Sequence, residues 1–416
     1  MAASASSGAP IYEAGDAPGG VAFSDRDEGF VFDRGIHILQ TTNASILTLF
    51  RELGIQFLEH KRRAYIYSHK TYTAYPFQIN TAGLPLGLRA RCLWGFFRRD
   101  EGAKPANYQE WMHSTLGKGF ADIFLTPYSE KFWTVHPREM TFEWAGNRVP
   151  KPSTAQVIRG ALWSKQTAIG SNATFRYPDS KHGYGAVARA LETRSGPIML
   201  GYRACSLNTG NRQLAFTNGI QITYEVLVNT IPLPELIRIC EDAPEKVRAA
   251  SAQLRTNSII VVNLGIDRPN ISDKHWVHFP ERDTSFFRIS YPHNFGPNAA
   301  PPGKSSISAE VSYSASRPVD KSTIVDRVID DLIRVGALGR KDPIILKKTH
   351  DIRYAYCIYD MHRKEALRTV LSWLREVGIV TCGRYGLWTY FWSDEAILSG
   401  KKAGEGVAQG RASSLP

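Results

Sequence analysis

Residues 11–20 read Ile-Tyr-Glu-Ala-Gly-Asp-Ala-Pro-Gly-Gly, a short apolar strand that ends at Glu13 and is followed by a glycine turn. A carboxylate at a strand end can accept hydrogen bonds from ribose hydroxyls, and glycines let the backbone approach a ligand closely. Alone, the decapeptide favours the simpler interpretation of a surface glutamate before a turn. It indicates a nucleotide-binding α/β unit only if other segments agree with it.

The rest of the chain mixes helical and strand patterns. Apolar residues recur at helical spacing over residues 322–335 and 363–377, and each stretch ends at a glycine, Gly336 or Gly378. The interleaving predicts an α/β or α+β fold with a substantial sheet. Residues rich in β-branched and aromatic side chains predict strands over 64–67, 221–228, 258–264, 286–291 and 306–312.

Composition excludes several classes of protein. The 416 residues are 43% hydrophobic, yet the longest apolar runs, such as 258–265, are far shorter than a membrane span of about 20 residues. The N-terminus lacks the pattern of a secretory signal, so a cytoplasmic location without a membrane partner is expected. The five cysteines are scattered without zinc-site spacing, which predicts reduced core residues.

The charge balance favours an anionic ligand. A formal net charge of +12 is compatible with nucleic-acid binding, but the basic residues are scattered, with only short runs such as Lys61-Arg62-Arg63. A small polyanion such as a nucleoside diphosphate accounts for part of the excess equally well. Nucleic acid is therefore the least favoured partner, and a salt-sensitive shift of labelled DNA would revive it.

Further segments carry a family resemblance. Residues 30–39, Phe-Val-Phe-Asp-Arg-Gly-Ile-His-Ile-Leu, resemble an F-x-x-G-G-H-x-L segment, and residues 75–80, Tyr-Pro-Phe-Gln-Ile-Asn, resemble Y-P-x-Q-x-N. Both belong to the UDP-galactopyranose mutase branch of the flavin amine-oxidase superfamily, which includes mutase-like proteins that act on GDP-L-galactose in antibiotic biosynthesis. Other matches follow in family order at 127–133, 147–150, 172–178, 230–234, 286–290 and 383–390.

The resemblance implies an α/β (α+β) fold in three parts: a discontinuous dinucleotide-type domain, a mainly helical insert and an antiparallel substrate-binding sheet. The first βα unit of the dinucleotide-type domain, with its G-x-G-x-x-G turn, is absent from the sequence before Ile11, so a truncated form of the fold is expected. The expected boundaries are 11–60, 183–260 and 375–400 for the dinucleotide-type domain, 81–146 for the insert, 61–80, 147–182 and 261–360 for the sheet domain, and 401–416 for a flexible tail.

The resemblance also implies site residues. Arg148 and Arg288 match two arginines that clamp the substrate diphosphate, a task that suits the planar fork of a guanidinium. Any single matching tyrosine is more simply a half-buried sheet aromatic, but the set together with both arginines favours a site. The remaining substrate-binding candidates are Tyr354, Tyr356, Tyr390, Arg384, Asn172 and Gln78; Asn172, like Arg176 in the same segment, could equally support the fold.

Two further departures from the family shape the cofactor expectation. Ile36 replaces the central glycine of Gly-Gly-His and would fill space beside a flavin ring, and His278 stands where a tyrosine is expected. With the G-x-G-x-x-G turn also absent, these changes predict that FAD is not bound. A divalent metal, Mg²⁺ or Mn²⁺, is expected instead to offset the diphosphate charge, with its protein ligands unknown.

The expected function is a flavin-free mutase that interconverts pyranose and furanose forms of a nucleoside-diphosphate hexose, with a GDP-linked sugar as the expected substrate. A homodimer is compatible with this class. We hypothesise that the substrate's own 4-hydroxyl attacks the anomeric carbon. The catalytic base would be His37 or His278.

Two other functions stay open at this stage. One is a FAD-dependent oxidoreductase of the protoporphyrinogen oxidase or amine oxidase type in shortened form, which a G-x-G-x-x-G upstream of Met1 would favour. The other is a non-catalytic binding protein, which would have no need of the diphosphate arginines. The presence of Arg148 and Arg288 argues against it.

Overall fold

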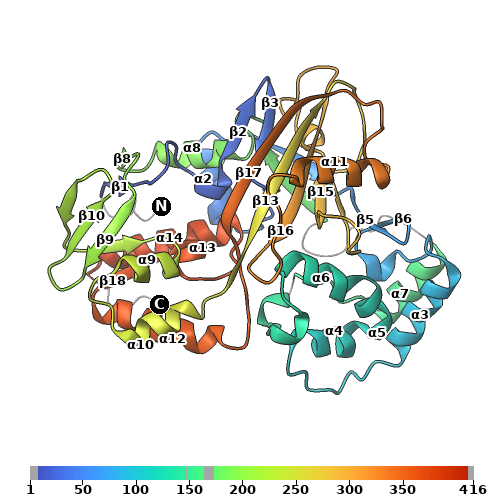
Figure 1. The fold of residues 1–416 in the computed structure, drawn as a ribbon, viewed down its shortest axis with the longest axis horizontal. Helices are drawn as coiled ribbons and strands as arrows, with labels where there is room; N and C mark the ends of the chain where they lie inside the picture. The colour runs from blue at the N-terminus through green and yellow to red at the C-terminus, as the bar shows by residue number, and fades with distance from the viewer. Residues whose placement is uncertain (1–7, 147, 164–172, 411–416) are drawn as a thin grey trace.

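The structure is a computed structural model that describes residues 8–146, 148–163 and 173–410. At its centre is a seven-stranded sheet with the order β17-β13-β16-β15-β14-β5-β6 (Figure 1). Neighbouring strands are antiparallel except β14 and β5, which are parallel. The strands are β5 (Ala64–Ser68), β6 (Thr71–Ala74), β13 (Thr256–Ile266), β14 (Trp276–His278), β15 (Arg288–Ser290), β16 (Ser305–Tyr313) and β17 (Ile344–Cys357).

Both faces of this sheet are covered. Successive residues of a strand point to opposite faces, and β13 shows the result. Ile260 and Val262 pack with α11 (Ile324–Arg334), whereas Ile259 and Val261 belong to the apolar cluster of the helical insert. Burial on both faces explains why β13 is almost continuously apolar.

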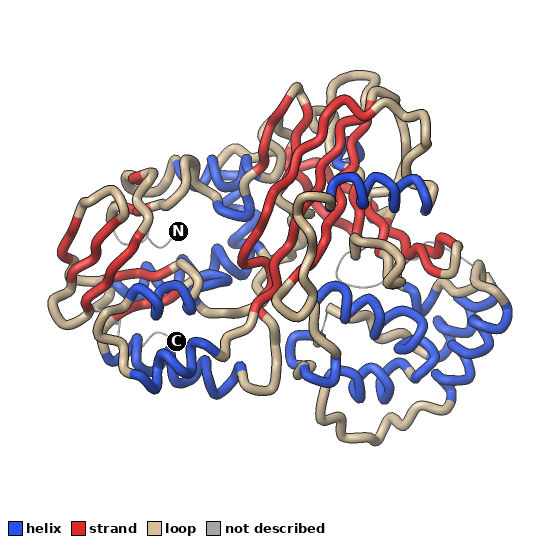
Figure 2. Tube along the Cα trace, in the orientation of Figure 1, coloured by secondary structure: helices blue, strands red, loops and turns tan. Residues whose placement is uncertain are grey.

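A helical body lies beside the sheet, at the lower right of Figure 1, and Figure 2 shows that it consists of helices and loops. At Gly119 a Cβ would lie 2.2 Å from the carbonyl oxygen of Arg91, so two helices meet backbone to backbone. The elements are α3 (Leu86–Phe97), α4 (Tyr108–Leu116), α5 (Lys118–Phe120), η3 (Ala121–Leu125), α6 (Thr126–Trp133), η4 (Pro137–Glu139), η5 (Glu143–Ala145) and α7 (Thr154–Leu162), with η2 (Phe77–Ile79) packed on α7.

A third part, at the left of Figure 1, combines small sheets with helices. β1 (Ile11–Tyr12) pairs in parallel with β8 (Ile198–Met199), and β12 (Leu227–Asn229) with β18 (Ile379–Thr381). Within the described ranges, no strand pairs with the second edge of β1. The other elements here are β9 (Ala204–Asn208), β10 (Gln213–Phe216), β11 (Gln221–Thr223), α8 (Gly185–Glu192), α9 (Leu233–Ile239), α10 (Glu245–Ala252), α12 (Arg363–Glu376), α13 (Gly383–Gly386) and α14 (Ser393–Ala408).

Two small pairs of strands connect these parts. The hairpin of β2 and β3 leads into the segment that ends at α2, and β4 pairs antiparallel with β7. Their bounds, with the short helices η1 and η6, are η1 (Gly20–Ala22), β2 (Ser24–Asp27), β3 (Phe30–Asp33), α2 (Ala44–Glu52), β4 (Phe57–Lys61), β7 (Thr174–Pro178) and η6 (Pro292–Asn294).

The mixed α/β class expected from the sequence is confirmed. The two expected helices are confirmed as α11 and α12, and Gly336 and Gly378 follow them with φ of 73° and 77°. The single strand expected over 221–228 is wrong, because a bend separates β11 from β12. The domain boundaries inferred from the sequence stay predictions.

The flexible tail expected over 401–416 is wrong in its first part. Helix α14 continues to Ala408, and its small residues Gly400, Ala403 and Gly404 are buried. Ala403 packs against Val380 beside β18, so the glycines and alanines that resembled a tail provide a close helix contact instead. Residues 411–416 lie outside the described residues.

The cysteines are all free, as expected for reduced thiols, but they are not all in the core. Cys205 is exposed, and the other cysteines, Cys92, Cys240, Cys357 and Cys382, are buried. Among the residues that the structure describes, no helix combines the length and the apolarity that crossing a membrane requires.

Candidate functional site

A cavity of about 580 Å³ lies where the sheet, the helical body and the third part meet. This volume is within the range of small-molecule sites. Its lining includes Gly19 of the glycine turn, Val187 and Ala188 of α8, and aromatic residues of α6. Residues of β14, β15 and β16 and of the segments around His37 and Tyr390 also line it.

The strand register places three functional side chains in one row. His278 of β14 is paired with Arg288 of β15, and Arg288 with Glu310 of β16. Glu310 Oε2 lies 2.6 Å from Nε and Nη2 of Arg288; Glu310 is buried, and the Arg288 side chain is 16% exposed. Burial, the largest single effect, lowers the pKa of Arg288, but the Glu310 carboxylate and the neighbouring tyrosines together raise it above its ordinary value. Arg288 is therefore charged and already paired.

Arg148 is held by aromatic rings and by one carboxylate. Its guanidinium carbon lies 4.4 Å from the ring centres of both Tyr390 and Trp392. Nη2 donates to the Tyr390 carbonyl oxygen at 2.6 Å and to Glu395 at 3.2 Å, whereas Nη1 has no hydrogen-bond partner in the described residues. Gln78 supports the backbone that follows Arg148, because its Nε2 donates to the Pro150 carbonyl oxygen.

Arg384 carries the most unsatisfied donor groups of the site. It belongs to α13, and its guanidinium carbon lies 4.9 Å from the Tyr356 ring centre and 5.1 Å from that of Tyr390. Its Nε and Nη2 are buried and have no hydrogen-bond partner in the part of the chain described. A buried cationic donor without an acceptor is costly, so this position fits an anionic ligand.

His278 is held on both sides of its ring. The Trp276 indole, which can only donate, lies 3.2 Å from Nε2, so the proton of the neutral ring is on Nδ1. Nδ1 then donates to the Tyr128 hydroxyl at 2.8 Å. Burial, with Arg288 and Arg62 close by, holds the pKa of His278 well below its ordinary range. In this arrangement neither ring nitrogen can accept a proton from a substrate.

His37 has a freer ring. Its Nδ1 lies 3.1 Å from the Gly35 carbonyl oxygen and donates to it, which leaves Nε2 as the acceptor. Burial lowers the pKa of His37 to about 4, and Arg384 and Arg288 contribute to this while the Gly35 carbonyl opposes it. At neutral pH the imidazole is uncharged, so Nε2 has a lone pair that can accept a hydrogen bond, while the lowered pKa makes the ring a weak base.

The cavity brings most of the sequence-predicted residues together. Tyr354 is an exception, because its hydroxyl donates to Glu235 at 2.5 Å and it does not line the cavity. Asn172 lies outside the described residues. Arg176 bonds Glu59 and the Thr41 carbonyl rather than the site. The residues that do line the cavity are His37, Gln78, Arg148, His278, Arg288, Tyr356, Arg384 and Tyr390, and their roles stay predictions.

Sequence reasoning missed Glu310 and Tyr128. Glu310 left a signal, because it is the one charged residue of the strand β16, and a carboxylate in a buried strand requires a partner. Tyr128 lay in a matched segment, but nothing in the sequence showed that its hydroxyl would meet His278.

The comparisons with known proteins identify the family. The family model for flavin-containing amine oxidoreductases matches residues 10–407. The chain belongs to this family.

Among solved structures, the chain is similar to a reduced UDP-galactopyranose mutase, with a TM-score of 0.91 and 26% sequence identity over 97% of this chain and 91% of that one. It also shares its fold with a putative protoporphyrinogen oxidase from Exiguobacterium sp. 255-15, with a TM-score of 0.73 and 16% identity over 98% and 96% of the two chains. A putrescine oxidase matches with a TM-score of 0.63 and 13% identity over 96% and 93%.

These findings correct the cofactor expectation. The expectation that the protein lacks FAD and relies on Mg²⁺ or Mn²⁺ is contradicted by the family match, because the family and these relatives are flavin proteins. In the described ranges, no group of three or more His, Cys, Asp and Glu side chains could hold a metal ion. Ile36 was expected to fill the space beside the flavin, but it packs against the buried cluster around Leu39, and the cavity persists next to it.

Proposed function

We propose that the protein is a sugar-nucleotide mutase that interconverts the pyranose and furanose forms of a nucleoside-diphosphate hexose. The observation that carries this proposal is the convergence of Arg148, Arg288 and Arg384 on one cavity, where buried N–H groups of Arg148 and Arg384 have no acceptor among the residues that the structure describes. A diphosphate offers several anionic oxygens to such donors. The similarity to UDP-galactopyranose mutase supports the same substrate class.

The charge of the cavity argues against an amine substrate. Arg34, Arg148, Arg288 and Arg384 line it, and Glu310 is the one carboxylate among the described lining residues. An excess of positive charge raises the local concentration of anions and repels ammonium groups. Oxidation of a porphyrinogen or another apolar substrate stays the second candidate, since the protoporphyrinogen oxidase shares the fold.

The cavity suits the ring of the family's flavin. Gly35 has φ of 86°, and a Cβ there would lie 3.0 Å from Glu310 Oε1, so the backbone itself forms that wall. We propose that Gly35 to His37 border the ring and that Glu13 and the turn at Gly19 hold the nucleotide half. In mutases of this branch, reduced flavin supplies the electron pair that reacts at the anomeric carbon.

The protein's own residues would bind the substrate and handle charge. Arg148, Arg288 and Arg384 bind the diphosphate and stabilise the negative charge that develops as it leaves the sugar. His37 accepts and returns the proton of a sugar hydroxyl through Nε2. The aromatic wall, which includes Phe132 and Trp133, excludes water from the open sugar.

The finer substrate preference is a GDP-linked hexose, such as GDP-L-galactose. This preference rests on the sequence resemblance to mutase-like proteins. Competition between GDP and UDP for the purified protein tests it directly: tighter binding of UDP would reject the GDP preference and leave the mutase proposal in place. The homodimer also stays a prediction.

A product assay tests the function. The full chain is incubated with flavin and dithionite and with UDP-galactopyranose or GDP-L-galactose, and the furanose form is separated by chromatography. We expect a furanose product from at least one of them. No conversion and no binding of either nucleotide, together with oxygen consumption on a porphyrinogen, would replace the mutase with the oxidoreductase.

A further inference from the structure

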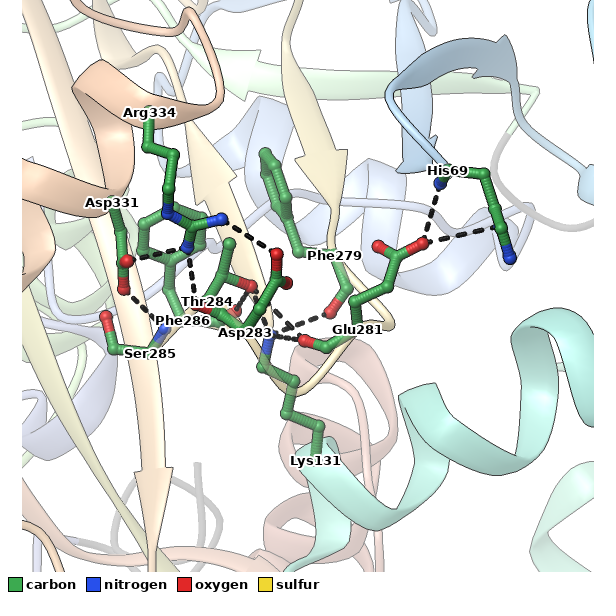
Figure 3. A network of polar contacts seen from close by, with 10 residues as sticks. All are labelled: His69, Lys131, Phe279, Glu281, Asp283, Thr284, Ser285, Phe286, Asp331 and Arg334. Atoms are coloured by element: carbon green, nitrogen blue, oxygen red, sulfur yellow. Dashed lines mark hydrogen bonds and ion pairs between the residues drawn. The ribbon is translucent and has the colours of Figure 1, made fainter.

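A buried lysine lies outside the cavity and is not used by the proposed mechanism. Lys131 of α6 is 2% exposed and does not line the cavity. Its Nζ donates to the carbonyl oxygens of Phe279 at 3.2 Å and Glu281 at 2.7 Å, and to the hydroxyl of Thr284 (Figure 3). The protons of one ammonium group match these acceptors.

All of these acceptors belong to one loop, residues 279–287, which joins β14 to β15. The loop begins directly after His278 and ends directly before Arg288. Its ends are closed by a hydrogen bond from Phe279 N to the Phe287 carbonyl at 2.9 Å. Whatever fixes this loop therefore also fixes where His278 and Arg288 stand in the cavity.

Three other contacts hold the loop, as Figure 3 shows. Asp331 of α11 accepts from Ser285 N at 2.7 Å, and Arg334 bonds Asp283 at 2.8 Å. Glu281 accepts from His69 N at 2.7 Å. Of these groups Ser285 and Asp331 are buried. From the side of the helical body the loop is bound by the buried Lys131 and by an ion pair of the exposed Arg282 with Glu130 of α6 at 2.6 Å.

Helix α6 also reaches the site directly. Tyr128, three residues before Lys131, receives the hydrogen bond from His278. The carbonyl oxygen of Phe132 accepts from Asn257 at 2.6 Å and from Ser312 at 3.0 Å, so the end of the helix is fixed to β13 and β16. A helix anchored in this way is a rigid support for the loop.

We infer that Lys131 is a positioning residue of the site: by binding the 279–287 loop to α6, it sets the place of Arg288 in the cavity. An ammonium group is expensive to bury, and methionine would fill the same space without that cost. The loop therefore requires the N–H donors of the Lys131 ammonium group. This inference rests on the proposed function, because Arg288 is placed there as part of a diphosphate site.

The test compares Lys131→Met with a matched control, Arg248→Met. Arg248 is also a cation that donates to backbone carbonyls, those of Ala243 and Glu241 among them, but it lies on α10 and does not line the cavity. Each variant loses a cationic side chain that donates hydrogen bonds to backbone carbonyl groups. Dissociation constants for GDP and UDP are measured by calorimetry, and stability by urea unfolding.

We expect Lys131→Met to bind the preferred diphosphate at least about tenfold more weakly, as a displaced binding group would. Lys131→Arg should restore most of the affinity. Arg248→Met should lose stability while its affinity stays within about twofold of the unchanged protein. Equal affinities for Lys131→Met and the unchanged protein, or an equal loss in both methionine variants, would overturn the inference.

A milder variant covers the case in which Lys131→Met does not fold. Thr284→Val removes one acceptor from the loop side, and its affinity should also fall. If the unchanged protein binds neither diphosphate, the proposed function fails, and hydrogen exchange decides about Lys131. Faster exchange over residues 276–290 in Thr284→Val, with none in Arg248→Met, supports the anchor; unchanged exchange rejects it.

Discussion

Glu310 joins Arg288 to the backbone of Ile36. One carboxylate oxygen lies 2.6 Å from the guanidinium, and the other accepts from the Ile36 N–H at 2.8 Å. The sheet and the turn before His37 are thereby connected through a single buried side chain.

Glu310→Gln should destabilise the protein strongly. The amide keeps the shape and one acceptor but leaves the Arg288 charge buried without compensation, which costs about 3 kcal/mol or more. Urea unfolding measures the change in the free energy of unfolding. Glu395→Gln is the control, since Glu395 is 41% exposed in its pair with Arg148 and should contribute less than about 1 kcal/mol. Equal losses in both variants would contradict the role given to Glu310.

Arg384→Met should weaken diphosphate binding with little loss of stability. The Nε and Nη2 of Arg384 have no acceptors in the described residues, so the substitution breaks no hydrogen bond made by these atoms there. The lost charge-assisted contact corresponds to about 1.5–3 kcal/mol of binding free energy. Calorimetry with GDP and UDP checks it, and Tyr354→Phe, outside the cavity, should bind as the unchanged protein does.

The stability of the protein should depend on pH through His37. Its pKa is about 4 in the folded protein and 6.5 in the unfolded chain, so the unfolded chain binds the proton first as the pH falls. The contribution is complete above pH 6.5 and is lost toward pH 4, by an amount on the order of 2 kcal/mol. Across this pH range, the free energy of unfolding of His37→Gln should fall less steeply than that of the unchanged protein. Parallel pH dependences in the two proteins would argue that the ring is not buried.

Gly35→Ala should be more damaging than an alanine at a comparable glycine. Both Gly35 and Gly54 have positive φ, 86° and 71°, and strain of about 1–2 kcal/mol is expected in each variant. At Gly35 the new Cβ would also lie 3.0 Å from Glu310 Oε1, whereas at Gly54 nothing lies within 4 Å. The difference between their unfolding free energies isolates the contact with Glu310.

The sequence predicted the fold where local patterns were strong. The apolar stripes of α11 and α12, and the β-branched run of β13, led to elements close to those observed. β17, with 14 residues, was missed because one half of it alternates exposed charged residues such as Lys347 with half-buried ones. Alternation without an apolar core face is a weak signal for a strand.

The site was predictable only in part. Family matches identified the arginines, but the pairing of Arg288 with Glu310 depends on strand register and could not be predicted from the sequence. His278 was expected as a base because its residue type titrates near neutral pH. Its hydrogen bonds with Trp276 and Tyr128 could be seen only once β14 and α6 had been brought together.

The bond between Ile36 and Glu310 joins residues 274 positions apart in the chain. Closing so long a loop is slow, and contacts of this kind form only after the local elements exist. During synthesis, the cavity therefore cannot form until β16 has left the ribosome, long after the turn before His37 has been made. A chain interrupted before that strand would contain His37 but would have no binding cavity. Its local elements could still form, so the sign of its incompleteness would be exposed apolar surface.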